Sequence, residues 1–400
     1  MRAKSQVIPA KLGVLKIAWE AWRFRRGDDK SIARRQQARL DDIVRHARTV
    51  SPYYRNLYRH LELGPVTLAS LPVVTKRDLM AHFDEWVTDP AISLESLRRD
   101  FLANPSLLGA RDLGRYHVAT TSGTSGDPAI LIHDDASWAL VHFVGGRGEL
   151  RFIARWDLLP RVLRRGLRVA ALFVTDAHDG AAAAMESARR RSPVLAKRIR
   201  TFSVLRPLTE LVTEINVFQP TVLVGYPSAL ALLASEQQAG RLRIQPLLAI
   251  TASEPLTPAF RADIESTFGC PVENRYGSAE FPGLAMECAH GLFHVNNDWY
   301  LLEPVDEDYR PVGPDVASHT VLVTNLANRV QPLIRYDLGD RVKLAATPWC
   351  MRQPAAGDHG GGTQRRPTLL RGTSRDVGHG AAARTRDCRS RKPPACAGFR

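Results

Sequence analysis

The sequence predicts an α/β fold with a largely parallel sheet, because short apolar and β-branched runs alternate with helical patterns from about residue 116 onward. A chain of 400 residues, 44% of them apolar, is long enough for two or three structural units around a substantial core. The expected strands are 168–174, 221–224, 247–251, 318–326 and 330–335, and the expected helices of this region are 226–238 and 256–268.

The first 115 residues are expected to form a helical, basic region before an α/β core at 116–346. Residues 12–26 mix aromatic and apolar side chains with lysine and arginine. Their helix either packs its aromatic face on the body or lies on a membrane surface. Residues 31–48 form a more polar helix. Thr75 ends a loop and is expected to cap the helix that follows it.

The sequence carries no segment that would direct the chain into or across a membrane. No uninterrupted apolar run approaches the ~20 residues of a membrane-spanning helix, and the N-terminus lacks the apolar stretch of a signal peptide. Five cysteines, an odd number, fit a reducing compartment. We therefore expect a cytoplasmic protein without a transmembrane segment. Its oligomeric state is left open.

The net charge of +14 suggests a nucleic-acid partner, but its distribution argues against one. Residues 347–400 hold 11 lysines and arginines and only 3 acidic residues, so more than half of the excess positive charge lies there. This segment shows neither helical nor strand periodicity and is expected to be a disordered basic tail. The mildly basic remainder suits an anionic small ligand, and no nucleic acid is predicted.

The strongest local motif is residues 120–128, which combine two glycines and five hydroxyl residues with a closing proline. Glycines let the backbone approach an oxyanion closely, and the hydroxyls add donors that can rotate toward it. The segment is not a Walker P-loop, because no Gly-Lys-Ser/Thr follows. Its composition alone fits a phosphate-binding loop or an ordinary turn.

Two further segments make the phosphate interpretation specific. Residues 275–280 read Arg-Tyr-Gly-Ser-Ala-Glu, and residues 335–340 read Arg-Tyr-Asp-Leu-Gly-Asp, with Thr-Ala-Ser-Glu-Pro at 251–255 before both. Their order and spacing resemble the adenylate-forming ligases. The most similar family is that of the phenylacetate–CoA ligases, with its coenzyme F390 synthetase and capsule-biosynthesis relatives. Residues 52–55 and 71–79 also look like that family, and the likeness covers roughly residues 35–346.

The resemblance implies the large N-terminal domain of an adenylate-forming enzyme, with parallel-sheet layers, and a two-step reaction. A small-molecule carboxylic acid reacts with ATP in the presence of Mg²⁺ to give an acyl-adenylate and pyrophosphate. A thiol, that of coenzyme A in most members, then takes the acyl group. The alternatives are an adenylating enzyme with a different acceptor, as in capsule pathways, and an inactive product that only binds nucleotide. The sequence does not identify the acid.

The resemblance also assigns site residues. Glu280 would bind the Mg²⁺, Ser278 would lie near the α-phosphate, and Thr124 would join them in the catalytic group. Tyr276 would pack on the adenine and Asp340 would accept hydrogen bonds from the ribose hydroxyls. The loop residues that would hold the β- and γ-phosphates are Ser122, Gly123, Thr124, Ser125 and Gly126. Ser253 and Glu254 would line the adenine pocket, and Tyr226, Pro227 and Ala279 are candidates for the acyl pocket.

Cys288 and His294 have a spacing suited to zinc ligands, but two ligands do not make a structural zinc site. Relatives often complete such a site with a Cys-x-Cys-Gly placed after the Tyr-x-x-Gly-Asp motif. Here that position holds the single cysteine Cys350. Zinc is therefore doubtful, and we expect at most a partial site.

The genetic code offers an account of the tail. Trp349 is encoded by TGG, Cys350 by TGT or TGC, and Met351 by ATG. If one G of the Trp codon is removed and Arg352 has a CGN codon, the shifted frame encodes Cys, Val or Ala, and Cys. The missing Cys-x-Cys is thereby restored. We interpret residues 349–400 as a frameshift product that replaces the C-terminal lid domain, and we expect acyl–CoA synthesis to be impaired. The rival interpretation is a genuine basic tail that binds nucleic acid or membrane.

The frameshift interpretation makes a prediction about the gene. Sequencing of the genomic DNA across codon 349 should show an alternative open frame that encodes the Cys-x-Cys-Gly and continues into a further domain. A shifted frame that closes shortly after codon 349 would show that residues 349–400 need another explanation.

Overall fold

The centre of the molecule is a sheet of eight strands in the order β14-β10-β9-β8-β7-β6-β4-β5. We analysed a computed structural model, which describes residues 29–62, 64–121, 128–145, 159–175, 178–288, 291–345 and 369–370. The five strands from β5 to β8 are parallel, and the remaining three continue the sheet antiparallel. The bounds are β4 (Val169–Phe173), β5 (Ile199–Ser203), β6 (Val222–Gly225), β7 (Leu248–Thr251), β8 (Val272–Tyr276), β9 (Ala285–Glu287), β10 (Phe293–Val295) and β14 (Leu369–Leu370).

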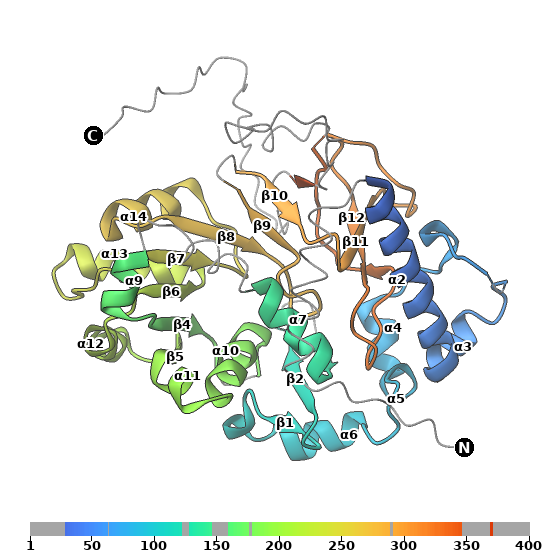
Figure 1. Cartoon of the computed structure of the whole chain (residues 1–400), viewed down its shortest axis with the longest axis horizontal. Helices are drawn as coiled ribbons and strands as arrows, with labels where there is room; N and C mark the ends of the chain where they lie inside the picture. Colours follow the sequence, from blue (N-terminus) through green and yellow to red (C-terminus); the bar gives the residue numbers. More distant parts are fainter. Residues whose placement is uncertain are drawn as a thin grey trace.

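The parallel strands are buried on both faces, as their continuous apolar runs predict. Val222 and Val224 belong to one core cluster, and Leu223 between them belongs to another. The second cluster includes the inner faces of three helices, α12 (Leu208–Phe218), α13 (Pro227–Gln238) and α14 (Pro258–Phe268). The first includes α7 (Asp135–Gly145) and α10 (Gly180–Arg190). Helices therefore cover both faces of the sheet (Figure 1), and the predicted α/β fold is confirmed.

The ends of these helices follow from local sequence. Pro227 occupies the first turn of α13, where its missing N–H costs no hydrogen bond. Thr257 caps α14, and Gly269 ends it in a left-handed conformation with φ 62°. Two further helices of this region are α9 (Leu159–Arg165) and α11 (Pro193–Arg198).

The described part of the N-terminal region, from residue 29 on, is mainly helical and shares its core with the α/β region. Its longest described helix, α2 (Asp29–Val50), lies beside β11 and β12 in Figure 1. The Arg39 guanidinium stacks 3.7 Å from the ring centre of Trp299, and Gln36 donates to the Asn297 carbonyl. The shorter elements are α3 (Pro52–Leu57), η1 (Leu68–Ser70), α4 (Lys76–Ala81), α5 (Phe83–Trp86), α6 (Leu94–Ser96), η2 (Leu97–Leu102) and η3 (Pro105–Leu107).

Two small antiparallel sheets complete the described fold. β1 (Arg111–Asp112), β2 (Tyr116–Thr120) and β3 (Ile130–His133) form one, and β2 begins where the sequence pattern changes near residue 116. β11 (Tyr300–Val305), β12 (Thr320–Asn325) and β13 (Tyr336–Asp337) form the other. The strand expected at 318–326 is therefore present as β12.

The prediction of a strand at 330–335 is wrong. These residues run between strands without joining a sheet, and Arg335 has φ 50°, outside the extended region. Nearby side chains bond the backbone N–H and C=O groups of β3 that a neighbouring strand would otherwise have bonded. Asn328 donates to the Ile132 carbonyl, and the Gln331 amide bonds both Ile130 and Ile132. An apolar pattern alone cannot distinguish such a segment from a strand.

Several sequence predictions fall outside the described residues, among them the helix at 12–26. Within the predicted tail, only Leu369–Leu370 are described, and they pair with β10 as an edge strand. Among the described helices, none is long and apolar enough to span a bilayer.

Three histidines surround the buried indole of Trp138, between β2, β3 and α7. The ring of His117 stacks on it at 4.9 Å, and those of His133 and His142 lie 5.1 and 5.8 Å away. The indole N–H donates to Ser187. Desolvation by burial lowers the pKa of His117 to about 4 and the pKa of His133 and His142 to about 3. These rings are therefore neutral in the folded protein at neutral pH.

This histidine cluster predicts that acid lowers the stability of the folded protein. The folded-state pKa values lie below the unfolded value of about 6.5, so the stability that depends on neutral rings is present above pH 6.5 and lost as pH falls toward 4. The loss should be about 2 kcal/mol per histidine at pH 5. Chemical denaturation of His133→Leu should show a shallower fall of unfolding free energy with pH than the parent. A substitution at exposed His319 is the control, and an unchanged slope for His133→Leu would contradict the prediction.

Candidate functional site

A cavity of about 900 Å³ opens at the carboxyl ends of the parallel strands, where ligands of open α/β sheets bind. The segments that follow β4, β6, β7 and β8 each contribute to its wall, together with α4 and the chain after β13. Its lining residues include Lys76, Arg98, Thr121, Asp179, Tyr226, Ser253, Ser278, Ala279, Glu280, Tyr336 and Asp340.

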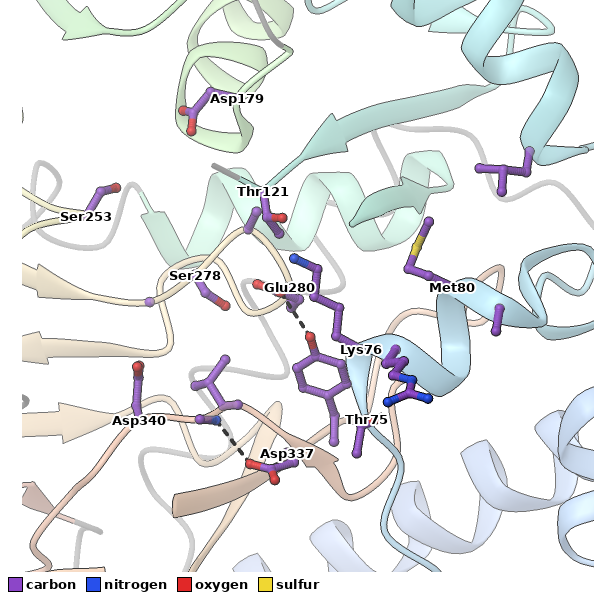
Figure 2. A pocket seen from close by; sticks show the side chains of 18 of the residues that line it. Thr75, Lys76, Met80, Thr121, Asp179, Ser253, Ser278, Glu280, Asp337 and Asp340 are labelled. Carbon is purple, nitrogen blue, oxygen red and sulfur yellow. Dashed lines mark hydrogen bonds between the residues drawn. The ribbon is translucent and has the colours of Figure 1, made fainter. Parts of the chain in front are cut away.

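Glu280 lies in the tight loop after β8 and is 7% exposed. Gly277 makes this loop possible: a Cβ there would lie 2.8 Å from the Phe281 carbonyl oxygen and 2.9 Å from the Gly283 nitrogen. The Tyr336 hydroxyl donates to Glu280 Oε1 at 3.1 Å (Figure 2). Burial, together with the Glu280 carboxylate, raises the pKa of Tyr336, so the phenol stays protonated and keeps donating.

Asp340 is held in a similar way by the other motif tyrosine. The Tyr276 hydroxyl donates to Asp340 Oδ2 at 2.8 Å, and both residues are buried. Asp340 lines the cavity, whereas Tyr276 lies behind it, with its ring 6.2 Å from that of Phe293. The two motifs that the sequence singled out are thus joined by two crossed tyrosine–carboxylate hydrogen bonds.

Arg335 fixes the position of Tyr336. Its guanidinium is almost fully buried and donates to Glu303 Oε2 at 3.0 Å and to the Leu71 carbonyl at 2.5 Å. Desolvation raises the pKa of Glu303, and the Arg335 charge opposes that effect. The backbone N–H of Val74 donates to the Arg335 carbonyl, and that of Asp337 donates to the Val74 carbonyl. The N-terminal region and the second motif are therefore locked together.

The N-terminal helix α4 brings positive charge to the cavity, which the sequence reasoning did not assign. Thr75 caps this helix, as expected, by accepting from the Asp78 N–H. Lys76 and Arg77 of α4 line the wall together with Arg98 of η2, and Figure 2 shows Lys76 reaching from α4 into the pocket beside Glu280. The only sequence signal was the basic pair that follows the helix cap at Thr75.

The predicted phosphate loop at 122–126 lies outside the described residues, but both of its ends are placed. Thr121 lines the cavity, and its backbone N–H donates to the Ala129 carbonyl at 3.1 Å. The Ala129 N–H in turn donates to the Thr121 hydroxyl at 2.9 Å. The described residues that flank the predicted loop are therefore hydrogen-bonded to each other, and Thr121 lies at the cavity. The members of the predicted loop are Ser122, Gly123, Thr124, Ser125 and Gly126.

Some of the remaining predicted site residues line the cavity and others do not. Ser253 lines the cavity with φ 69°, a left-handed conformation uncommon for serine. Glu254 is exposed, does not line the cavity, and accepts from the Ser228 hydroxyl at 2.7 Å. Tyr226 and Ala279 line the cavity, whereas Pro227 is buried in the first turn of α13. The family resemblance assigned Glu254 and Pro227 to the site, whereas here only their neighbours Ser253 and Tyr226 line the cavity.

Cys288 and His294 belong to the β9–β10 hairpin. Cys288 is a free thiol in the turn, and His294 pairs with Met286 across the hairpin. In the part of the chain that the structure describes, no group of three or more histidine, cysteine or acidic side chains is arranged to hold a metal ion.

No family model matches the chain. Phenylacetate–coenzyme A ligase of Aromatoleum evansii is 25% identical over 331 residues, which cover 77% of this chain and 66% of the ligase. Protein CapK of Staphylococcus aureus is 28% identical over 135 residues, which cover 33% of this chain and 28% of CapK. The chain thus spans about two thirds of the ligase that it matches and a smaller share of CapK.

A solved structure supports the same relationship at the level of fold. The open conformation of 2-hydroxyisobutyryl-CoA ligase, in complex with 2-HIB-AMP and CoA, is similar with a TM-score of 0.57 and 20% sequence identity. The match covers 78% of this chain and 69% of that one. The described region therefore has the fold of an adenylate-forming CoA ligase, as the sequence motifs predicted.

The anchoring role of Arg335 can be tested by removing its partner. Glu303→Gln leaves a buried guanidinium without its counter-charge and should lower the unfolding free energy by about 3 kcal/mol. Asp308→Asn is the matched control, since the Arg310–Asp308 pair is exposed and should matter by less than about 1 kcal/mol. Equal losses in the two variants, measured by denaturant titration, would show that Glu303 does not anchor this segment.

Proposed function

We propose that this homologue of the phenylacetate–CoA ligases activates a carboxylic acid with ATP. The observation that carries the proposal is the convergence of Glu280, Asp340 and Thr121, the described residue directly before the Ser/Thr/Gly loop, on one cavity at the carboxyl edge of the sheet. Tyr336 and Tyr276 hold the two carboxylates by hydrogen bonds. A volume of about 900 Å³ is sufficient for a nucleotide and a small acid together.

The reaction requires positioning more than acid–base chemistry. A substrate carboxylate oxygen attacks the α-phosphorus of ATP, a P–O bond forms, and the bond to pyrophosphate breaks. The carboxylate is already a nucleophile, so no catalytic base has to take a proton. The chain has to hold the two anions together and compensate their charge. Lys76, Arg77 and Arg98 supply positive charge on the cavity wall, and Ser278 supplies a hydroxyl.

The acidic residues present fit a magnesium–nucleotide complex. Glu280 is the buried carboxylate of the central loop, and an oxygen ligand of this kind is what Mg²⁺ prefers. When bound, the ion would neutralise phosphate charge. Asp340, at the other end of the wall, would accept from the ribose hydroxyls while Tyr276 keeps it in place. The Tyr276 ring supports the nucleotide site from behind instead of stacking on the base.

The second half-reaction is proposed from similarity alone. Coenzyme A would take the acyl group through a thioester and release AMP, as expected for a relative of the CoA ligases. A different acceptor in a cell-surface pathway is the second candidate, and the partial similarity to CapK favours it as the alternative. We place the chain in the cytoplasm, where ATP and coenzyme A are available and where the free thiols Cys270 and Cys288 remain reduced.

Nucleotide binding is directly testable. Millimolar Mg²⁺-ATP should raise the melting temperature of the full chain by a few degrees, because a ligand that binds only the folded state stabilises it. Asp340→Ala should weaken nucleotide affinity roughly 10- to 100-fold through loss of charged hydrogen bonds. Glu280→Gln should reduce the Mg²⁺ dependence of the shift. Isothermal titration with ATP, with and without Mg²⁺, gives the affinities.

The control for both variants is Glu307→Gln, whose side chain is 87% exposed. It should bind Mg²⁺-ATP like the parent. If well-folded parent protein shows no thermal shift at millimolar Mg²⁺-ATP, the proposed function is wrong.

A further inference from the structure

We propose that Asp179 determines the substrate class of the cavity by selecting carboxylic acids with a hydrogen-bond donor beside the carboxyl group, above all a protonated amine. This inference rests on the proposed function, because it concerns the acyl part of the same site. Asp179 lines the cavity but belongs to neither sequence motif and to none of the predicted site residues.

Three observations place Asp179 at the acyl end of the cavity, near Tyr226 and Ala279. It directly follows His178, whose carbonyl accepts from the Thr120 N–H at 2.8 Å, and it forms a parallel bridge with Thr120 itself. On its other side, a Cβ built on Gly180 would lie 3.1 Å from the Cβ of Ala279. Asp179 is therefore fixed between the start of the Ser/Thr/Gly loop and the Ser278–Glu280 wall, next to the proposed site of carboxylate attack.

Figure 2 shows how the charged groups are distributed. In this view Asp179 lies at one end of the pocket and Asp340 at the other, with Ser278 and Glu280 between them. Lys76 reaches into the pocket beside Glu280. The charged group at the acyl end is thus the Asp179 carboxylate, whereas Lys76 supplies a cation beside Glu280 in the phosphate region.

The Asp179 carboxylate is only partly satisfied by the protein. Its Oδ1 accepts from the Ala181 and Ala182 N–H groups and so caps α10, at 3.0 and 3.3 Å. Among the described residues, no lysine or arginine forms an ion pair with Asp179, and no hydrogen-bond donor contacts its Oδ2. Burial raises the pKa of Asp179, although the two N–H groups act in the opposite direction. A partly buried carboxylate without a counter-ion is stabilised when a ligand supplies one.

Tyr226 completes this end of the cavity. Its ring lies 5.3 Å from that of Phe173 in an edge-to-face arrangement. Burial, followed by the Asp179 charge, raises the pKa of Tyr226 to about 12, so the phenol is neutral. An acyl chain here meets an aromatic wall and one negative charge. An amine forms a charge-assisted hydrogen bond with that carboxylate, a hydroxyl forms a weaker one, and a purely apolar acid leaves it unpaired.

The test uses three acyl-sulfamoyl adenosines that share a phenyl ring and mimic the acyl-adenylate. Phenylacetyl, mandelyl and phenylglycyl derivatives carry hydrogen, hydroxyl and protonated amine at the same carbon. Titration calorimetry with the full-length chain should rank them phenylglycyl, mandelyl, phenylacetyl. The first should bind at least tenfold more tightly than the last. This assay measures binding and does not depend on turnover.

Asp179→Asn is the decisive variant, because asparagine caps a helix as well as aspartate but carries no charge. It should reduce the ratio of phenylglycyl to phenylacetyl affinity to about one. Asp179→Ser, also a good cap, gives an independent variant if the first fails to fold. Glu307→Gln, on a side chain that is 87% exposed and outside the cavity, should leave the ratio unchanged.

The outcomes separate the two proposals. If all three compounds bind with equal affinity, or if Asp179→Asn retains the parent ratio, the role of Asp179 is wrong while the adenylate site stands. If none of the three binds to well-folded protein, the proposed function itself fails, and the assignment of Asp179 fails with it.

Discussion

The segment from Asn328 to Tyr336 is the constraint on which the site depends. Up to Arg335 it lies outside any sheet, so its backbone groups need partners from elsewhere. Tyr54 and the Trp86 indole both donate to the Pro332 carbonyl, at 3.1 and 2.7 Å, and Gln331 reaches β3. These contacts tie the N-terminal helices, the small β2–β3 sheet and the β11–β13 sheet to one strip of chain. The strip ends at Tyr336, whose hydroxyl holds Glu280.

This arrangement explains why residues distant in sequence form one cavity. The carboxyl ends of parallel strands supply one wall, as the geometry of any open parallel sheet requires. The opposite wall comes from α4 and the chain after β13, which the Val74 backbone bonds hold together. The result is a pocket that holds both signs of charge, with basic side chains from the N-terminal helices, the tyrosine-bonded carboxylates of Glu280 and Asp340, and the Asp179 carboxylate at the start of α10. Such a pocket suits a ligand with phosphates on one side and a donor group on the other.

Local sequence was sufficient for most elements of the fold. The strands β4, β6 and β7 and the helices α2, α13 and α14 lie close to where the apolar periodicity and cap residues predicted them. The Thr75 cap is present, and the order of the motifs led to the correct fold. The prediction failed at 330–335, where side-chain hydrogen bonds replace a sheet. It also failed for the neighbours of true lining residues, since Glu254 and Pro227 turn away from the cavity.

The sequence by itself determined which motifs the chain carries and in what order, because motif order is a linear property. Only the tertiary structure decided how the acids are held. The tyrosine–carboxylate bonds link residues 56 and 64 positions apart, and no local pattern encodes which tyrosine faces which acid. The same holds for Lys76 and Asp179, which in the sequence are one of many basic residues and an ordinary helix-cap residue. Their chemistry arises from the packing that places both on one cavity and leaves the carboxylate of Asp179 without a counter-ion among the described side chains.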